Sequence, residues 1–500
     1  MIGKKQVNER MRKTEANIHL SKDLSIKTKA APFFILLSVC PGTFLSHFSA
    51  GLVNIALPDL SLYFQAPLSI TQWIVTGYLL AIMLCLPVMG NLSDKYGKKI
   101  IHNSGYIVFG IGIVLSGFSF SLALLLMARI LQGVGAAMLQ SANIAIISEH
   151  YPEGKRGKAL GIIGTAVGVG ALLGPSVGGL LINWFSWRVM FWIQIPIVIA
   201  AFILASKFIP KDATNHEIKS FDYLGAMLFG IFITFIMFVL NEIGEGEINK
   251  QLLIAGLAAM LSFLLFVWRL QKNNNPFIDV KILSQPMVCA GSLIIVVSYM
   301  ATFSTLVLLP FYLRGVLGVS PSLSGLLIMS YPLLLAVIGP ISGAFSDRFG
   351  HCFAIIIGLI LMIASFAGLS MLSTVTPVIF VVFLLCLLGF SMGILNSPNY
   401  NLIIHNVPFQ YLGIITSTIA LLRNFGMALG TALGVTFMNY FVEGALTKLM
   451  NVDNPKQAGN VMTGFHSFFL LIAMLTACVT VYFIILNKKV KTNLTYVAKR

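Results

Sequence analysis

The sequence predicts an all-α protein that crosses a membrane many times, and three observations predict this fold class. First, 57% of the 500 residues are hydrophobic and only 10% are charged, whereas soluble proteins carry about 25% charged residues. Second, the mean hydropathy of the chain is +0.90. Third, the apolar residues form runs of about 20, the length that crosses the hydrocarbon core as a helix. Because these runs are continuous and do not alternate, they exclude a transmembrane β-barrel.

Fourteen runs are expected to span the membrane, with approximate limits 33–57, 71–90, 101–121, 122–147, 160–183, 188–209, 223–242, 251–269, 287–313, 323–342, 353–373, 376–402, 411–440 and 463–487. An even number of spans leaves both tails on the same side. Basic residues concentrate in both tails and in alternate loops, and such segments stay in the cytosol. We therefore expect a multi-pass protein of the cytoplasmic membrane with both termini in the cytosol.

The net charge of +16 does not indicate nucleic-acid binding, because the cations follow the predicted topology. Eight of them lie in the tail before the first span. This tail could also touch anionic lipid headgroups, although a topology signal alone explains it.

No pattern in the sequence indicates an enzyme. The six cysteines are scattered without a C-x-x-C pair, so no metal site or disulfide framework follows from them. No nucleophile–base set or phosphate-binding loop is apparent. We expect neither a metal nor a cofactor.

Two charged decapeptides repeat a pattern. GNLSDKYGKK (90–99) and GAFSDRFGHC (343–352) both fall in predicted cytosolic loops, eight spans apart. This offset fits two six-helix halves with two extra helices inserted between them. The predicted organisation, from the N-terminal to the C-terminal tail, is 1–32, 33–209, 210–286, 287–487 and 488–500.

Rows of small residues support this duplication. Gly170, Gly174 and Gly178 lie four residues apart in the fifth span, and Gly426, Gly430 and Gly434 repeat the spacing in its counterpart, the thirteenth. Such rows let helix backbones approach closely in lipid. Internal duplication around a site at the membrane midplane is the architecture of secondary transporters.

These motifs resemble those of the major facilitator superfamily. GNLSDKYGKK is similar to its first loop signature, and LLLMARILQGVGAA (124–137) resembles its fourth-helix signature around an arginine, here Arg129. GIIGTAVGVGALLGPSVGG (161–179) resembles the fifth-helix signature of drug antiporters. Fourteen spans point to the multidrug:proton antiporter branch of that family.

The resemblance implies a gating role for the charged loops. Asp94 would belong to a charge latch at the cytosolic end of the second span, with Lys95 and Lys98 as partners or lipid anchors. Gly90 and Gly97 would allow the reversal, and Asp347 and Arg348 would repeat the latch in the other half. The alternative interpretation is a basic topology loop with one solvated carboxylate.

Arg129 is expected to face a central cavity. At 100° per residue, Gln132, Ala136, Gln140 and Asn143 lie within about 60° of it and form one polar stripe. A guanidinium in the membrane is costly, so it should face a cavity or a partner. The alternative is an arginine that extends to the outer headgroups.

Glycines of the fifth helix, Gly170, Gly174, Gly178 and Gly179, are expected to set close packing at the seam between the halves. Pro175 would kink the helix there. Direct contact of these residues with substrate is the alternative.

The first span departs from the family pattern. In SHFSAGLVNIALPD, Ser49 stands where antiporters of this branch carry an aspartate, whereas Asn54 matches. That aspartate is a usual candidate for proton coupling, and the first half offers no other acid within a span. His47 could titrate instead, although it lies about 160° around the helix from Ser49; the alternative is a histidine that only packs or forms hydrogen bonds. A cavity with Arg129 and no carboxylate should disfavour lipophilic dications and tolerate neutral or anionic amphiphiles.

We therefore expect an efflux transporter that exports amphipathic drugs by alternating access against proton entry. Its partners would be small amphipathic substrates, protons and membrane lipids, its energy source would be the proton gradient, and the protein would be a monomer. The alternatives are an exporter of a lipid, fatty acid or metabolite without the usual proton coupling, and a transporter-like sensor.

Overall fold

The structure is a computed structural model that describes residues 33–57, 59–66, 68–151, 153–210, 222–243, 250–273, 280–407, 412–442 and 455–497. Within these ranges all regular secondary structure is helical. The all-α fold class is thereby confirmed.

The N-terminal part contains the first span, Phe33–Leu57, followed by α2 (Leu68–Thr71), α3 (Trp73–Tyr96), α4 (Lys98–Gly117), α5 (Leu122–His150), α6 (Glu153–Trp184), α7 (Val189–Trp192) and α8 (Gln194–Phe208). The central part contains α9 (Tyr223–Ile243), α10 (Lys250–Lys272) and α11 (Val280–Leu283). The C-terminal part contains α12 (Pro286–Phe311), the short π-helix η1 (Tyr312–Val316), α13 (Pro321–Ile328), α14 (Ser330–Phe349), α15 (His351–Leu369), α16 (Val378–His405), α17 (Leu412–Val442) and α18 (Pro455–Val497).

Thirteen helices of the described residues are long and apolar enough to cross a membrane. Each coincides with a predicted span. The remaining prediction, 411–440, corresponds to α17, which has 31 residues and is not among the thirteen. It carries two strongly polar residues, Arg423 and Asn424.

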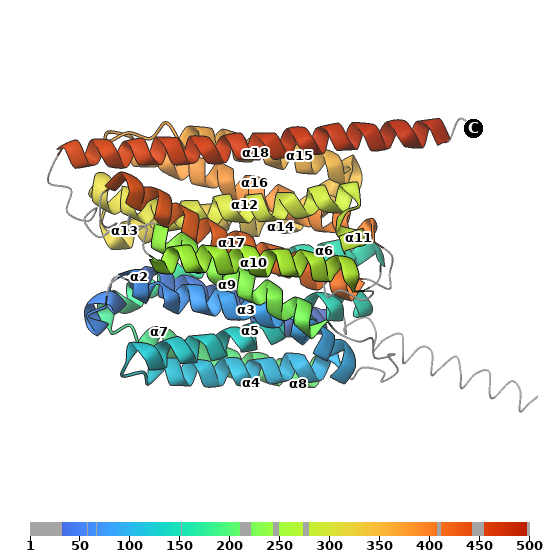
Figure 1. Ribbon diagram of the computed structural model, residues 1–500, viewed down its shortest axis with the longest axis horizontal. Coiled ribbons are helices and arrows are strands. Elements are labelled where there is room, and N and C mark those ends of the chain that lie inside the picture. The colour runs from blue at the N-terminus through green and yellow to red at the C-terminus, as the bar shows by residue number, and fades with distance from the viewer. Residues whose placement is uncertain are drawn as a thin grey trace, which may run out of the picture.

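The long helices lie roughly parallel, and the short elements mark the two ends of the bundle (Figure 1). Helices α2, α7 and α13 lie at one end and α11 at the other, as the predicted topology requires. The buried apolar side chains form two large clusters, one mainly from the N-terminal part and one mainly from the C-terminal part. The exact domain limits stay a prediction.

One of the two inserted helices, α9, contacts both parts of the molecule. Helix α9 packs against α3 and also against α17. Gly230 of α9 faces Leu84 of α3, and Thr436 of α17 donates a hydrogen bond to the carbonyl of Leu240 at 2.5 Å. Helix α10 packs on α9, and Arg269 forms an ion pair with Asp222 at 3.1 Å.

The repeated decapeptides form the same turn twice. Gly97 separates α3 from α4 with φ 99° and ψ 136°, and Gly350 separates α14 from α15 with φ 91° and ψ 144°. Side chains rarely adopt this backbone region, so both positions favour glycine. The duplication read from the sequence is therefore also a duplication of backbone geometry.

Alanine at Gly97 or at Gly350 tests these turns. The strained backbone should cost about 1–3 kcal/mol of folding free energy and lower the melting temperature of the detergent-solubilised protein. The control is Gly179→Ala in α6, where an added Cβ meets nothing within 4 Å and helix propensity favours alanine. Unchanged melting of both turn variants would contradict this account.

Candidate functional site

The polar stripe of α5 lies against the first span, and four of its side chains donate hydrogen bonds to that span. Arg129 Nη1 and Gln132 Nε2 donate to Ser49 Oγ at 2.8 and 2.9 Å. Farther along, Gln140 Nε2 donates to Ser46 Oγ at 2.6 Å. The last pair joins Asn143 Nδ2 to Thr43 Oγ1 at 2.5 Å. Because Thr43, Ser46 and Ser49 are three residues apart, they share one face of their helix.

Arg129 is fully buried inside the protein, with a relative exposure of 0%. Its guanidinium lies over the Tyr78 ring, 4.1 Å from the centroid, and donates to Gln132 Oε1 at 2.6 Å and to the carbonyl of Ile74 at 3.3 Å. Its Nη2 has no hydrogen-bond partner among the described residues. The structure thus places Arg129 against internal partners and not at the headgroups.

Arg423 and Asn424 of α17 complete the arrangement, and the sequence analysis missed them. Arg423 Nη2 and Asn424 Nδ2 both donate to Gln140 Oε1, each at 3.0 Å. Gln140 therefore joins the first span to α17 through its two ends. The signal available in the sequence was an arginine inside the apolar run 411–440, which costs at least about 2.5 kcal/mol on insertion scales.

We call this group the central polar layer. Its members are Thr43, Ser46, Ser49, Tyr78, Arg129, Gln132, Gln140, Asn143, Arg423 and Asn424. Tyr78 contacts two members of the layer. Its hydroxyl donates to the Ser46 carbonyl at 2.8 Å, and its ring faces Arg129. The layer contains two guanidinium groups.

The other two predicted residues of the first span differ in their surroundings. His47 is buried, and its Nδ1 lies 2.8 Å from the Thr43 carbonyl. A carbonyl only accepts, so Nδ1 carries hydrogen; Nε2 has no partner among the described residues. His47 is close enough to interact electrostatically with Arg423. Asn54 is half-buried and takes no part in the layer.

Neither arginine of the layer forms an ion pair with an acidic residue that the structure describes. The described acidic side chains lie at the ends of helices: Asp59, Asp94, Glu149, Asp222 and Glu242. Desolvation raises the pKa of Asp59, which stands just beyond the first span, above its ordinary value.

The predicted latch residues lie at the cytosolic end of the predicted topology. Lys98 is buried and forms an ion pair with Glu149 at the end of α5. This pair joins two helices of the same half. Asp94 is exposed at the end of α3, and Gly90, one turn earlier, faces Ser417 of α17. Hence this end of α3 abuts the C-terminal half.

Lys95 and Arg348, two further predicted latch residues, each lie near the aromatic ring of the next residue in the sequence. The amino group of Lys95 lies 5.1 Å from the Tyr96 ring centroid, and Arg348 lies 5.5 Å from that of Phe349. The Asp347 side chain is outside the described part of the structure. The latch itself stays a prediction.

The fifth-helix glycines lie elsewhere than predicted. Carbons added at Gly170 and Gly174 would lie 2.5 Å from the Phe44 carbonyl oxygen and 2.7 Å from Gly51 Cα. Pro175 and Gly178 likewise face the first span, whereas Gly179 faces open space. This row therefore packs α6 against the first span of its own half, and not at the seam between halves.

The C-terminal row repeats this arrangement. Gly426 and Gly430 of α17 face the backbone of α12 at Val296 and Met300. In each half, then, the glycine-rich helix packs on the first helix of that half. The helix period predicted which glycines share a face, but not which neighbour that face meets.

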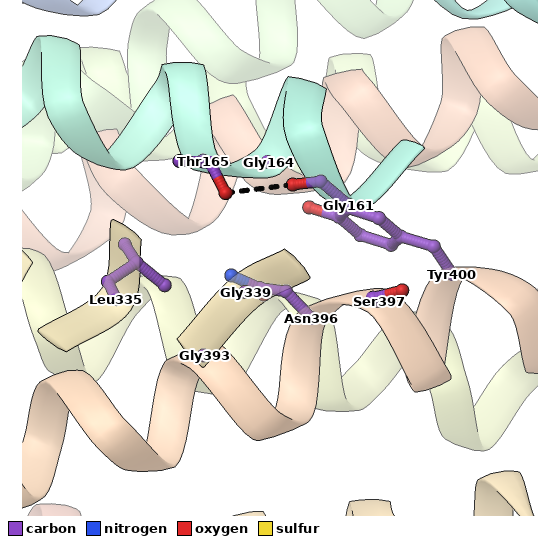
Figure 2. Close-up of a pocket in the computed structure, with 9 residues that line it drawn as sticks. All are labelled: Gly161, Gly164, Thr165, Leu335, Gly339, Gly393, Asn396, Ser397 and Tyr400. Carbon is purple, nitrogen blue, oxygen red and sulfur yellow. Dashed lines mark hydrogen bonds between the residues drawn. The ribbon is translucent and has the colours of Figure 1, made fainter. Parts of the chain in front are cut away.

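A different face of α6 forms the seam with the C-terminal half. Gly161, Gly164 and Thr165 line a small pocket opposite residues of α14 and α16 (Figure 2); these are Leu335, Gly339, Gly393, Asn396, Ser397 and Tyr400. Ser397 Oγ is buried without a hydrogen-bond partner among the described residues. The Tyr400 hydroxyl lies 3.0 Å from that of Tyr299, which interacts electrostatically with Arg423. A hydrogen bond thus connects the pocket to Tyr299 of α12.

The protein is a many-helix membrane bundle in which a buried polar layer joins the first span and α5 to α17. The Major Facilitator Superfamily model matches residues 39–431. The chain therefore belongs to this superfamily, which is a family of transporters and not of enzymes.

Several relatives are named for a function. The chain is 34% identical to the riboflavin transporter RibZ of Clostridioides difficile, over 82% of this chain and 88% of that protein. It is 25% identical to the lincomycin resistance protein LmrB of Listeria monocytogenes, over 90% and 96% of the two chains. It is 28% identical to the tetracenomycin C resistance and export protein of Streptomyces glaucescens, over 81% and 76%.

Among solved structures, the human organic anion transporter MFSD10 matches with a TM-score of 0.59 at 15% identity. The match covers 89% of this chain and 99% of that one. This likeness shows the fold.

Replacement of Gln140 by leucine tests the central bridge. The change removes the acceptor of Arg423 and Asn424, and each buried donor left unpaired costs about 1–3 kcal/mol. We expect a lower melting temperature in detergent and weaker coupling between the halves. The control is Ser141→Ala, which removes only a bond to Met138 within the same helix. Equal melting of the two variants would argue against the bridge.

Leucine at Gly164 tests the seam pocket. An added Cβ at Gly164 meets nothing within 4 Å, so the side chain should enter the pocket without breaking the backbone contacts. We expect slower substrate transport at unchanged expression, because a filled seam restricts movement of α6 against α14 and α16. Gly179→Leu in the same helix is the control and should transport normally.

Proposed function

We propose that the protein is a secondary active exporter that moves amphipathic small molecules out across the cell membrane by alternating access. The observation that carries this proposal is the hydrogen-bonded bridge from the first span through Gln140 to Arg423 and Asn424. Polar and charged side chains inside a membrane are expensive, and they mark the paths of substrates and ions. A bridge between two duplicated halves is a contact that must break when the halves move.

The direction of transport is proposed from the relatives. Two of them are resistance or export proteins for lincomycin and tetracenomycin C. We propose that this chain likewise exports amphipathic compounds. A layer of hydroxyl, amide and guanidinium groups between apolar clusters suits such amphipathic molecules.

A second candidate is transport of a metabolite such as a flavin. The riboflavin transporter shares 34% identity with this chain, and the layer offers amide and hydroxyl groups to a polar heterocycle. This candidate and drug export share the same fold and site, and differ only in substrate. A transporter-like sensor would bind such compounds without moving them.

Proton coupling is also a proposal. Ser49 contacts Arg129 and Gln132 directly, so the position where the family carries an aspartate faces a buried cation. His47 lies close to the layer, and because histidine titrates near neutral pH in water, we propose it as the group that exchanges the proton. We propose that protons moving down their gradient into the cytosol bind to and leave His47.

We propose that gating occurs at the ends of α3 and α14 that the predicted topology places in the cytosol. Asp94 stands one turn beyond Gly90, where α3 meets α17. Such a contact can act as a two-state element whose equilibrium the substrate biases. The ion pair of Lys98 with Glu149 would keep α4 and α5 together while α3 and α17 separate.

Replacement of Asp94 by asparagine tests the gate. We expect reduced transport with little loss of inserted protein, because the side chain is exposed and asparagine keeps its size while removing its charge. The measurement is substrate flux per mole of reconstituted protein. The control is Asp59→Asn, because Asp59 lies just beyond the first span, on the side of the membrane opposite to Asp94 in the predicted topology. Wild-type flux in Asp94→Asn would refute the gate.

Reconstitution tests the function as a whole. Purified protein in liposomes that contain a pH-sensitive dye is supplied with riboflavin, lincomycin and a set of charged drugs. Movement of both substrate and protons would support the proposed exchange, and its loss in His47→Gln would assign the proton site. Substrate movement without proton movement would remove proton coupling from the proposal. Binding without movement of any compound would indicate the sensor.

A further inference from the structure

Two cations are buried in the central polar layer without a described counter-ion. Arg129 is 0% exposed and Arg423 is 3% exposed. Neither forms an ion pair with a described acidic residue. Each keeps a buried nitrogen without a hydrogen-bond partner among the described residues, Nη2 in Arg129 and Nε in Arg423. The layer therefore has spare donors from two helices, α5 and α17.

The other members of the layer cannot balance this charge. They are hydroxyl and amide groups, which supply dipoles and no negative charge. A buried charge is normally paired, because an uncompensated one is strongly destabilising. A net positive interior of this kind is complementary to an anion.

Gln140 supplies the point at which an anion would act. Its single Oε1 accepts from both Arg423 and Asn424. A negatively charged oxygen is a stronger acceptor for the same donors than a neutral amide oxygen. An anionic group that reached α17 would therefore compete with Gln140 for these two donors.

We propose that the central polar layer recognises an acidic group of the substrate, a carboxylate or another organic oxyanion, and that this group takes over Arg423 and Asn424 from Gln140. The inference rests on the proposed transport function and specifies its substrate class. The exchange breaks the hydrogen bonds that hold α5 to α17 and leaves Gln140 bonded to Ser46. Substrate charge thereby releases the bridge between the halves. Arg129 adds a second positive charge to the same layer.

A pair of dyes with one ring system and opposite charge tests this proposal. Carboxyfluorescein is an anion, and a rhodamine ester has the same xanthene ring with a positive charge. Binding is measured by thermal shift in detergent and flux in liposomes, using the full-length wild-type protein. We expect carboxyfluorescein to bind and to be transported, with at least about tenfold weaker binding of the rhodamine ester, the size of effect associated with a hydrogen bond to a charged group.

Variants of Arg423 locate the site. Arg423→Gln should weaken carboxyfluorescein binding about tenfold or more, whereas Arg423→Lys keeps the charge and should retain part of the binding. The control is Arg188→Gln. Arg188 precedes α7 at one end of the bundle, where it contacts Tyr63 and Ser119 outside the central polar layer. The Arg188→Gln variant should therefore bind the anion normally.

Ser49→Asp gives an independent test that adds a charge and removes no arginine. The new carboxylate would stand beside Arg129, because Ser49 Oγ lies 2.8 Å from its Nη1. We expect weaker binding of carboxyfluorescein and stronger binding of the rhodamine ester than in the wild type. This variant remains informative if Arg423→Gln fails to fold.

The outcomes separate the two proposals. Binding of the anion that depends on Arg423, without flux of any compound, would support the site and contradict the transport function. Flux of neutral or cationic compounds, with no binding of the anion, would overturn the charge proposal and leave the transport function standing. Anion binding that is equal in wild type, Arg423→Gln and Ser49→Asp would also overturn it.

Discussion

A bilayer interior offers no water to polar side chains, so every buried donor depends on an acceptor supplied by the protein. In this molecule much of that demand converges on Gln140. Its amide nitrogen serves Ser46 of the first span, and its oxygen serves Arg423 and Asn424 of α17. Gln140 therefore links α5 to the first span through its donor end and to α17 through its acceptor end. Around this link, Ala420, Leu421 and Ala428 of α17 belong to the apolar cluster formed mainly by the N-terminal part.

Helical periodicity was enough to predict part of this site. The stripe of Arg129, Gln132 and Gln140 follows from the angle between residues of one helix, and the structure confirms that these side chains face one partner helix. Arg423 escaped because its function depends on contact with a residue 283 positions earlier in the chain. Such a contact is set by tertiary packing, about which the local pattern carries no information.

The glycine rows show the same limit. Their spacing identified a face that allows close approach, and the contacts of Gly170 and Gly174 confirm close approach. The neighbour was predicted as the other half, but it is the first span. Any helix with small residues on one face can meet either neighbour at short range. The turns at Gly97 and Gly350 were easier, because the reversal depends on the residues of the turn alone.

The inserted helices give the molecule two unequal sides. Helix α9 packs against α3 of the N-terminal half and α17 of the C-terminal half, and so links the two halves on one side of the molecule. The seam of α6 with α14 and α16 carries a glycine-lined pocket (Figure 2). The side linked by α9 resists separation of the halves. Rocking of the halves should therefore open the opposite side, where α6 meets α14 and α16, more widely. A compound dissolved in the lipid leaflet would then enter sideways, between helices, without first passing through the aqueous phase.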